Sequence, residues 1–161
     1  MFILGIDPGF AITGYGLVDY TGNKLRHVAN GVINTRAGEL FSSRLRTIDS
    51  ELSEIIDKYD PDAMAIEELF FNNNAKTAIM AAHGRGVALL CCSKAGLPCY
   101  EYTPLQVKQN VVGYGRAEKK QVQHMVKVLL NLDHIPKPDD AADALAIAIC
   151  HANSLLIAER I

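Results

Sequence analysis

The first part of the chain alternates apolar and polar positions in the manner of β-strands. A short apolar run at residues 2–6 ends in the turn signature Asp7-Pro8-Gly9, as expected for a buried strand that stops at its carboxyl end. Residues 15–20 and 25–35 alternate well enough to form two more strands, and Thr21-Gly22-Asn23 supplies the turn between them. The pattern therefore predicts three strands at the start of the chain.

Helical and strand patterns then follow one another. From Glu39 to about Tyr59 apolar residues recur every three or four positions with charges between them, which predicts an amphipathic helix. The remaining pattern predicts strands at 62–67 and 97–102, and helices at 74–95, between Thr103 and Gly113, at 117–130 and from Pro138 onward. This order predicts an α/β fold, a five-stranded mixed sheet with helices on both faces.

Length and composition agree with a single globular domain over residues 1–161. The chain has 161 residues, of which 49% are hydrophobic and 21% charged, enough apolar surface for a core and too little charge for a disordered chain. The apolar N-terminal run is too short for a signal peptide or membrane anchor, which favours a cytoplasmic location and no membrane partner. The cysteines lack Cys-x-x-Cys spacing and are expected to be buried, reduced thiols: Cys91, Cys92, Cys99 and Cys150.

Four carboxylates stand where a buried element ends or begins. Asp7 and Glu67 each close a predicted strand. Asp140 and Asp143 lie three residues apart in the first turn of the last helix and so share a face. Each has a simpler explanation as a turn residue, a solvated strand end or an acid favoured by the helix dipole. Glu68 points to the opposite face from Glu67, so at most one of that pair can join Asp7.

Together the four acids indicate a site for hard metal cations. Gathered carboxylates repel one another unless cations lie between them, and oxygen donors without His or Cys suit Mg²⁺ or Mn²⁺. Two such ions about 4 Å apart can activate water and stabilise the leaving oxygen in phosphodiester cleavage. We therefore predict two-metal nuclease chemistry with these catalytic residues and metal ligands: Asp7, Glu67, Asp140 and Asp143.

Charge is distributed unevenly along the chain. The net charge of −2 at first argues against a DNA partner. Between Lys76 and Lys127, however, the sequence contains eight basic residues and only two acidic ones, Glu101 and Glu118, which gives this segment a net charge of +6. The basic residues of this segment could bind the phosphates of a nucleic acid, although a solvated helix face is the more frequent explanation for any one of them. Phe70 or Phe71, directly after the two glutamates, is a candidate for stacking on distorted nucleic acid.

Several motifs closely resemble the RuvC family of bacterial Holliday junction resolvases, in order and over essentially the whole chain. They are Gly5-Ile6-Asp7-Pro8-Gly9, Thr13-Gly14-Tyr15-Gly16, Ile66-Glu67, Gln106-Val107-Lys108-Gln109, Ala117-Glu118-Lys119, Gln121-Val122-Gln123-His124-Met125 and Asp140-Ala141-Ala142-Asp143-Ala144-Leu145-Ala146. The resemblance implies an RNase H-like fold, a homodimer and Mg²⁺-dependent paired nicking of four-way DNA junctions in recombination and repair. It also implies cooperation with the RuvA–RuvB branch-migration complex.

The resemblance also implies roles for individual residues. The family's acidic ligands fall on the same four acids, which implies Mg²⁺, two ions per subunit, with Mn²⁺ as a substitute. Its DNA-contacting lysines fall on Lys108 and Lys119, and its junction-contacting aromatic on Phe70. With two more residues from the basic segment, the DNA-binding candidates are Phe70, Lys108, Arg116, Lys119 and Lys120.

The sequence leaves open which residues form the dimer interface. The Ala- and Gly-rich helix from Lys76 to Leu90 is a candidate for the dimer interface, and packing onto its own sheet is an equal alternative. Because a junction with two-fold symmetry needs two symmetric incisions, an isologous dimer suits it.

Replacing Lys108 or Lys119 with Ala is expected to weaken DNA binding or turnover without unfolding the domain.

Other functions share some of these features. An ATPase of the actin and sugar-kinase superfold also uses an Asp-x-Gly hairpin, but it needs two lobes and a second phosphate loop, for which this length leaves no room. An RNase H-like nuclease acting on RNA would share the first motif and not the pattern from Gln106 to Met125. A DNA-binding module without cleavage would not need all four acids. Nicking of a synthetic junction with and without Mg²⁺ distinguishes these alternatives.

Overall fold

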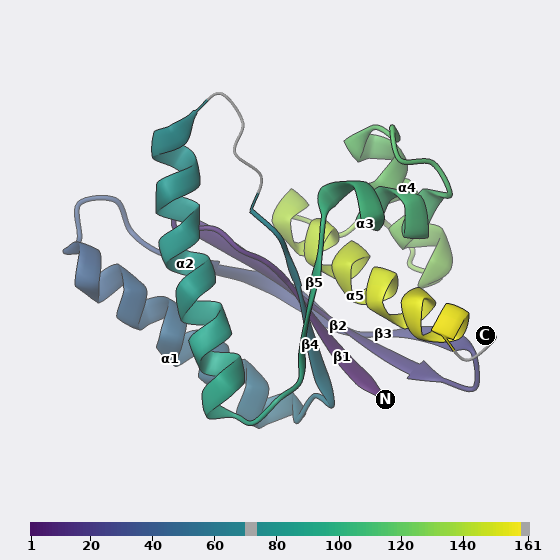
Figure 1. Ribbon diagram of the computed structural model, residues 1–161, viewed down its shortest axis with the longest axis horizontal. Helices are drawn as coiled ribbons and strands as arrows, with labels where there is room; N and C mark the ends of the chain where they lie inside the picture. The colour runs from purple at the N-terminus through teal and green to yellow at the C-terminus, as the bar shows by residue number, and fades with distance from the viewer. Residues whose placement is uncertain (70–73, 159–161) are drawn as a thin grey trace.

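A five-stranded mixed sheet forms the centre of the computed structural model, which describes residues 1–69 and 74–158 (Figure 1). The strand order is β3-β2-β1-β4-β5. The strands are β1 (Phe2–Asp7), β2 (Ile12–Thr21), β3 (Lys24–Asn34), β4 (Ala63–Glu67) and β5 (Cys99–Tyr102). The first three pair antiparallel, whereas β4 pairs parallel with both β1 and β5. Because β1 and β4 are parallel, their carboxyl ends lie at the same edge of the sheet.

Helices cover both faces of this sheet, as predicted (Figure 1). One face carries α1 (Phe41–Tyr59) and α2 (Ala75–Lys94), and the other carries α3 (Pro104–Val112), α4 (Lys119–Leu129) and α5 (Asp139–Ala158). Alternate residues of β1 serve the two cores: Leu4 and Ile6 pack with α1 and α2, and Ile3 packs in the core formed with α3, α4 and α5.

The last helix, α5, lies very close to the sheet. A Cβ atom on Gly5 would be 2.1 Å from the carbonyl oxygen of Ala144, and one on Gly14 would be 2.0 Å from that of Asp140. Only glycine leaves room for a helix backbone at these points. The glycines of β1 and β2 therefore fix the height and register of the first turns of α5 over the sheet.

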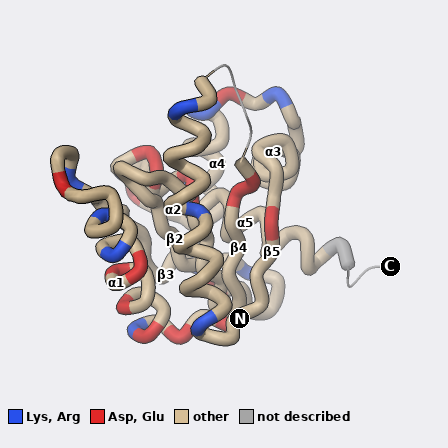
Figure 2. Tube along the Cα trace, turned by 60° about the vertical axis from the view of Figure 1, so that its left-hand side comes forward, with Lys and Arg blue, Asp and Glu red and all other residues tan. Residues whose placement is uncertain are grey.

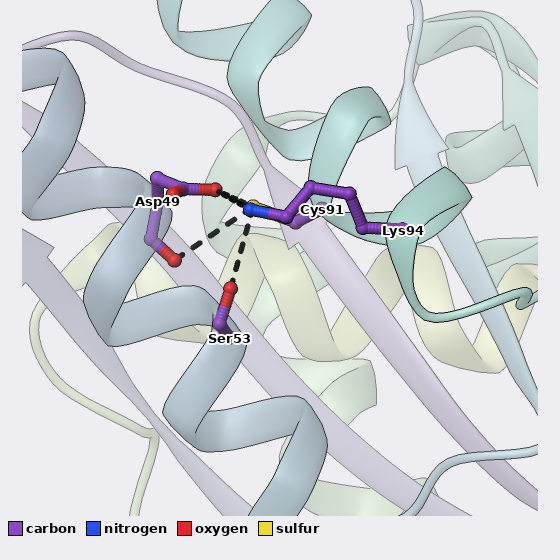
Figure 3. Close-up of polar contacts among 4 residues, drawn as sticks. All are labelled: Asp49, Ser53, Cys91 and Lys94. Atoms are coloured by element: carbon purple, nitrogen blue, oxygen red, sulfur yellow. Dashed lines mark hydrogen bonds and ion pairs between the residues drawn. The ribbon is translucent and has the colours of Figure 1, made fainter.

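The two helices on the opposite face are joined by a polar cluster (Figure 3). The thiol of Cys91 donates to Asp49 Oδ1 at 3.1 Å, and Lys94 Nζ pairs with the same oxygen at 2.8 Å. Burial and the hydrogen bond to Asp49 raise the pKa of Cys91 to about 11, so this thiol stays protonated at neutral pH. All four cysteines are free, but Cys99 is exposed, so the prediction that every thiol is buried is wrong for Cys99.

The predicted element boundaries hold to within a few residues. The helix expected from residue 117 begins at Lys119, because Glu118 and Gln121 form a capping box there. Another part of the backbone lies close to Gly84 of α2, where a Cβ would be 2.4 Å from the carbonyl oxygen of Gly9. Gly86, in the same helix, has open space beside it. Within the described residues, none of the helices has the length and apolar character needed to cross a bilayer.

Candidate active site

The four predicted acids meet at one edge of the sheet. Asp7 and Glu67 end the adjacent parallel strands β1 and β4, which are in register at Ile6 and Ile66. The first two turns of α5 bring Asp140 and Asp143 to the same edge, because the Asp140 backbone rests against Gly14 of β2. The parallel strand pair and the close helix packing thus gather side chains that are up to 136 positions apart in sequence.

Burial and neighbouring negative charges raise the pKa values of Asp7 and Glu67. Burial, followed by the negative charges of Glu67, Asp143 and Asp140, raises the pKa of Asp7 to about 8. Burial and the charge of Asp143 raise the pKa of Glu67 to about 7, against the opposing effect of Lys108 and Lys119. At neutral pH the metal-free site therefore retains protons on acids that are ordinarily ionised.

Lys119, in the first turn of α4, supplies a positive charge to this cluster. Its Nζ lies 2.8 Å from Asp143 Oδ2 and 3.9 Å from Asp139 Oδ2. The hydrogen bond to Asp143 raises the pKa of Lys119, while burial raises the pKa of Asp143 despite this lysine. Lys119 is thus the counter-ion of the acids in the metal-free protein.

The donor set fits a hard divalent cation, although its side chains are not drawn together around one point. Among residues 1–69 and 74–158, no three His, Cys, Asp or Glu side chains form a group that could hold a metal ion as they stand. The available donors are carboxylate oxygens without nitrogen or sulfur, the set that suits Mg²⁺ or Mn²⁺. Burial and mutual repulsion raise the pKa values of Asp7 and Glu67, and bound cations would offset this repulsion.

Two of the acids, Glu67 and Asp143, line a cleft of about 240 Å³, which we call the acidic cleft. The charged residues that line it are two acids, Glu67 and Asp143, and two lysines, Lys108 and Lys119. The other lining residues are apolar: Pro104, Val107, Val122 and Ala146. A phosphodiester that enters this cleft meets two lysine side chains and two carboxylates. This arrangement suits metal-assisted attack on a phosphate.

Arg85 of α2 holds the end of β4 in place, and sequence reasoning missed it. Its Nε donates to the carbonyl oxygen of Glu67 at 3.2 Å, and its guanidinium forms an ion pair with Glu101 of β5. The Arg85 side chain is only 17% exposed. Since these contacts depend on where α2 crosses β4 and β5, no local motif around Arg85 signals them.

The remaining predicted residues lie outside this cluster. Arg116 and Lys120 are exposed and do not line the acidic cleft. Phe70 falls outside the described residues. Glu68 is exposed, so of the two adjacent glutamates only Glu67 joins Asp7, as the strand alternation predicts.

Comparison with known proteins gives a consistent result. A family model described as "Crossover junction endodeoxyribonuclease RuvC" matches residues 3–151. The protein of that name from Ruminiclostridium cellulolyticum is 63% identical over 154 residues, covering 96% of this chain and 93% of the relative. Its counterpart from Caldanaerobacter subterraneus subsp. tengcongensis is 57% identical over 161 residues, covering 100% of this chain and 98% of the relative.

Solved structures agree with the fold. Thermus thermophilus RuvC superimposes with a TM-score of 0.91 at 36% identity, covering 98% of this chain and 97% of that chain. T. thermophilus RuvC in complex with a Holliday junction substrate gives 0.93 at 36% identity, covering 98% and 96%. The RNase H-like fold expected from the sequence is confirmed.

Proposed function

The chain belongs to the RuvC family of crossover junction endodeoxyribonucleases, and from that premise we propose that it resolves four-way (Holliday) DNA junctions by hydrolysing phosphodiester bonds. Nucleases of this family are metal-dependent. One domain over residues 1–161 carries the activity, in homologous recombination and DNA repair. The observation that supports this best is the half-buried acid cluster, in which the charges of Glu67, Asp143 and Asp140 act on Asp7.

The catalytic residues and metal ligands of this proposal are Asp7, Glu67, Asp140 and Asp143. They would hold two Mg²⁺ ions per subunit, with Mn²⁺ as a substitute. When bound, the metal lowers the pKa of a water molecule and neutralises charge on the phosphate. The protein's part is to place the backbones of these acids at the ends of β1 and β4 and at the start of α5, from where their carboxylates would share the bound cations.

The two lysines of the acidic cleft act on the substrate. Lys119 pairs with Asp143 in the metal-free protein, and cations bound by the acids would release its ammonium group for a DNA phosphate. Lys108, on the wall formed by α3, gives a second point of attachment. The apolar wall, which includes Val107 and Val122, limits the access of bulk water and strengthens these charge interactions. The further DNA contacts are Phe70, Arg116 and Lys120.

Symmetry supports a homodimer. A junction with two-fold symmetry requires two equivalent incisions, which an isologous pair of identical sites provides. The outer surface of α2 carries the exposed apolar residues Ile79 and Leu90, which suits a contact with a second copy. Family membership is the basis for cooperation with the RuvA–RuvB complex, and the chromosomal substrate is the basis for a cytoplasmic location.

A junction-nicking assay tests this function. Wild-type protein and Asp7→Asn are incubated with a synthetic four-way junction labelled on each strand in turn, with Mg²⁺ or with EDTA. We expect paired nicks at symmetric positions for the wild type with Mg²⁺ only, and none for the variant. Binding without cuts would refute the nuclease assignment, cuts in EDTA would refute the metal dependence, and cleavage by Asp7→Asn would refute the site.

A further inference from the structure

A second groove lies across the β1–β2 turn from the acidic cleft. Its volume is about 570 Å³, and we call it the cationic groove. It is lined by the turn that follows Asp7, by α1 and by the start of α2: Pro8, Gly9, Phe10, Ala11, Ile12, Arg44, Lys76, Thr77, Met80 and Ala81. Its two charged residues, Arg44 and Lys76, are both basic. None of these residues takes part in the active site described above.

Arg44 is held rigidly without an acidic partner. Its guanidinium carbon lies 4.0 Å from the centre of the Phe10 ring, and its Nε donates to Thr35 Oγ1 at 2.9 Å. The Thr35 hydroxyl in turn donates to the carbonyl oxygen of Phe10 at 2.6 Å. In the part of the chain that the structure describes, no Asp or Glu forms an ion pair with Arg44. The groove therefore presents a fixed guanidinium whose charge is not compensated.

The start of α2 adds positive potential to the same groove. Lys76 and Thr77 stand in the first turn of this 20-residue helix, which contains no acidic residue. A cation at this position opposes the helix dipole, and helix N-termini favour anions. Lys76 is exposed, and no ion pair holds it among residues 1–69 and 74–158. An anion in the groove would thus meet Arg44, Lys76 and the positive end of the α2 dipole together.

The groove and the acidic cleft open at one end of the molecule. In Figure 1 the start of α2, the end of β4 and the start of α5 all lie at this end. Figure 2 shows basic positions at the start of α2 and acidic positions at the end of β4 on the same side. The acidic cleft is lined by α3, α4 and α5 on one face of the sheet and the groove by α1 and α2 on the other, and the turn that follows Asp7 lines the groove. A ligand long enough to pass over this turn can occupy both sites.

We propose that the cationic groove binds backbone phosphates of the DNA molecule whose cleaved phosphodiester lies in the acidic cleft. This inference rests on the proposed function. Its charge suits phosphates, and its apolar floor, which includes Ile12 and Met80, suits the deoxyribose between them. Because these contacts involve the backbone, they position the junction and carry no sequence preference.

A salt-dependent binding titration tests the groove. The affinity for a fluorescent four-way junction is measured over a range of salt concentrations, with Ca²⁺ in place of Mg²⁺ to prevent cleavage. The test variants are Lys76→Glu, which leaves the packing intact and favours the α2 dipole, and the double variant Arg44→Gln/Lys76→Ala. The matched control is Arg46→Gln/Lys58→Ala, which removes the same two charges from α1 outside the groove.

We expect the Arg44→Gln/Lys76→Ala variant to bind about 10-fold or more weakly and the slope of log K against log salt to fall by about 2. Lys76→Glu should weaken binding at an unchanged or higher melting temperature, and the control should change far less. Equal losses in test and control variants would overturn the proposal. A loss of junction affinity that follows dissociation of a dimer, measured by sedimentation, would overturn it as well.

The wild-type titration separates this proposal from the function on which it rests. If wild-type protein does not bind the junction, the proposed function fails. If it binds and nicks the junction while the groove variants bind equally well, only the groove assignment fails.

Discussion

The acidic cleft and the cationic groove flank one turn of the chain, yet they hold their charges in opposite ways. At the cleft and directly beside it, the carboxylates of Glu67 and Asp7 are half-buried among like charges, and their pKa values are raised to about 7 and about 8. In the groove Arg44 is fixed by an aromatic ring and a hydroxyl group, and Lys76 is exposed. The acids at the cleft therefore repel one another, whereas repulsion between Arg44 and Lys76 in the groove is weak.

This difference separates chemistry from binding. Charges that must act on a reacting phosphate are placed where water is scarce, at a cost to the stability of the metal-free protein. Charges that only hold the DNA backbone remain near water, where they cost little and contribute little to folding. Variants of the acids should therefore change activity and stability in opposite directions, whereas variants of exposed groove residues should change binding alone.

The largest effect is expected from Asp7→Asn. It should lower metal-dependent nicking by about 1,000-fold or more, because a metal ligand is lost. The same variant should be more stable than the wild type without metal at pH 9, by about 2 kcal/mol, because a buried carboxylate that resists ionisation is gone. Chemical denaturation with EDTA measures this. Lys76→Ala is the comparison from the groove, and equal stability changes in the two variants would break the contrast.

The pH dependence of stability follows from the same acids. Their folded pKa values lie above those of the unfolded chain, so the native state binds more protons than the unfolded state. The resulting stability is fully present below about pH 4 and is lost as pH rises through 7 and 8. Metal-free wild-type protein should thus lose stability over this range, and Asp7→Asn should lose less. Mg²⁺ should restore more stability at pH 8 than at pH 6, because protons compete with the metal. A metal-free profile that rises from pH 5 to 8 would contradict this.

Arg85 should come next in size. Arg85→Ala frees the Glu67 carbonyl and the end of β4, and a displaced Glu67 should lower kcat by about 100-fold at similar junction affinity. The variant should also need more Mg²⁺ for half-maximal rate, a change that general loosening of the fold would not produce. Arg85→Lys keeps the charge but not the fork, so it should recover only part of the rate. An unchanged kcat and Mg²⁺ requirement together with a lower melting temperature would make Arg85 purely structural.

The two lysines of the cleft should show the smallest effects and differ from each other. Lys108→Ala and Lys119→Ala should each weaken binding or turnover about 10-fold without unfolding the domain. Lys119→Ala alone should also lower the Mg²⁺ concentration required, because it removes the cation that pairs with Asp143. Magnesium titration by calorimetry compares the two variants. Equal Mg²⁺ affinity in both would refute the role of Lys119 as counter-ion.

Much of the fold and the four acids could be predicted from the sequence because their signals are local. Strand alternation separates Glu67 from Glu68, and helical spacing places Asp140 beside Asp143. Arg85 could not be found in this way, since its partners Glu67 and Glu101 are brought to it only by the crossing of α2 over the sheet. The groove was missed for the same reason, because Arg44 and Lys76 come from different helices. Cys99 was misplaced because the short strand β5 lies at an edge of the sheet.

Anomalous diffraction from crystals soaked in Mn²⁺ tests the central claim, that the acids are gathered to receive divalent cations, most directly. We predict manganese bound by Asp7 together with Glu67, Asp140 or Asp143, and Lys119 moved away from Asp143. Asp7→Asn crystals should lose the signal. Manganese bound elsewhere, or a cleft in which Lys119 stays paired with Asp143 at saturating Mn²⁺, would contradict the account.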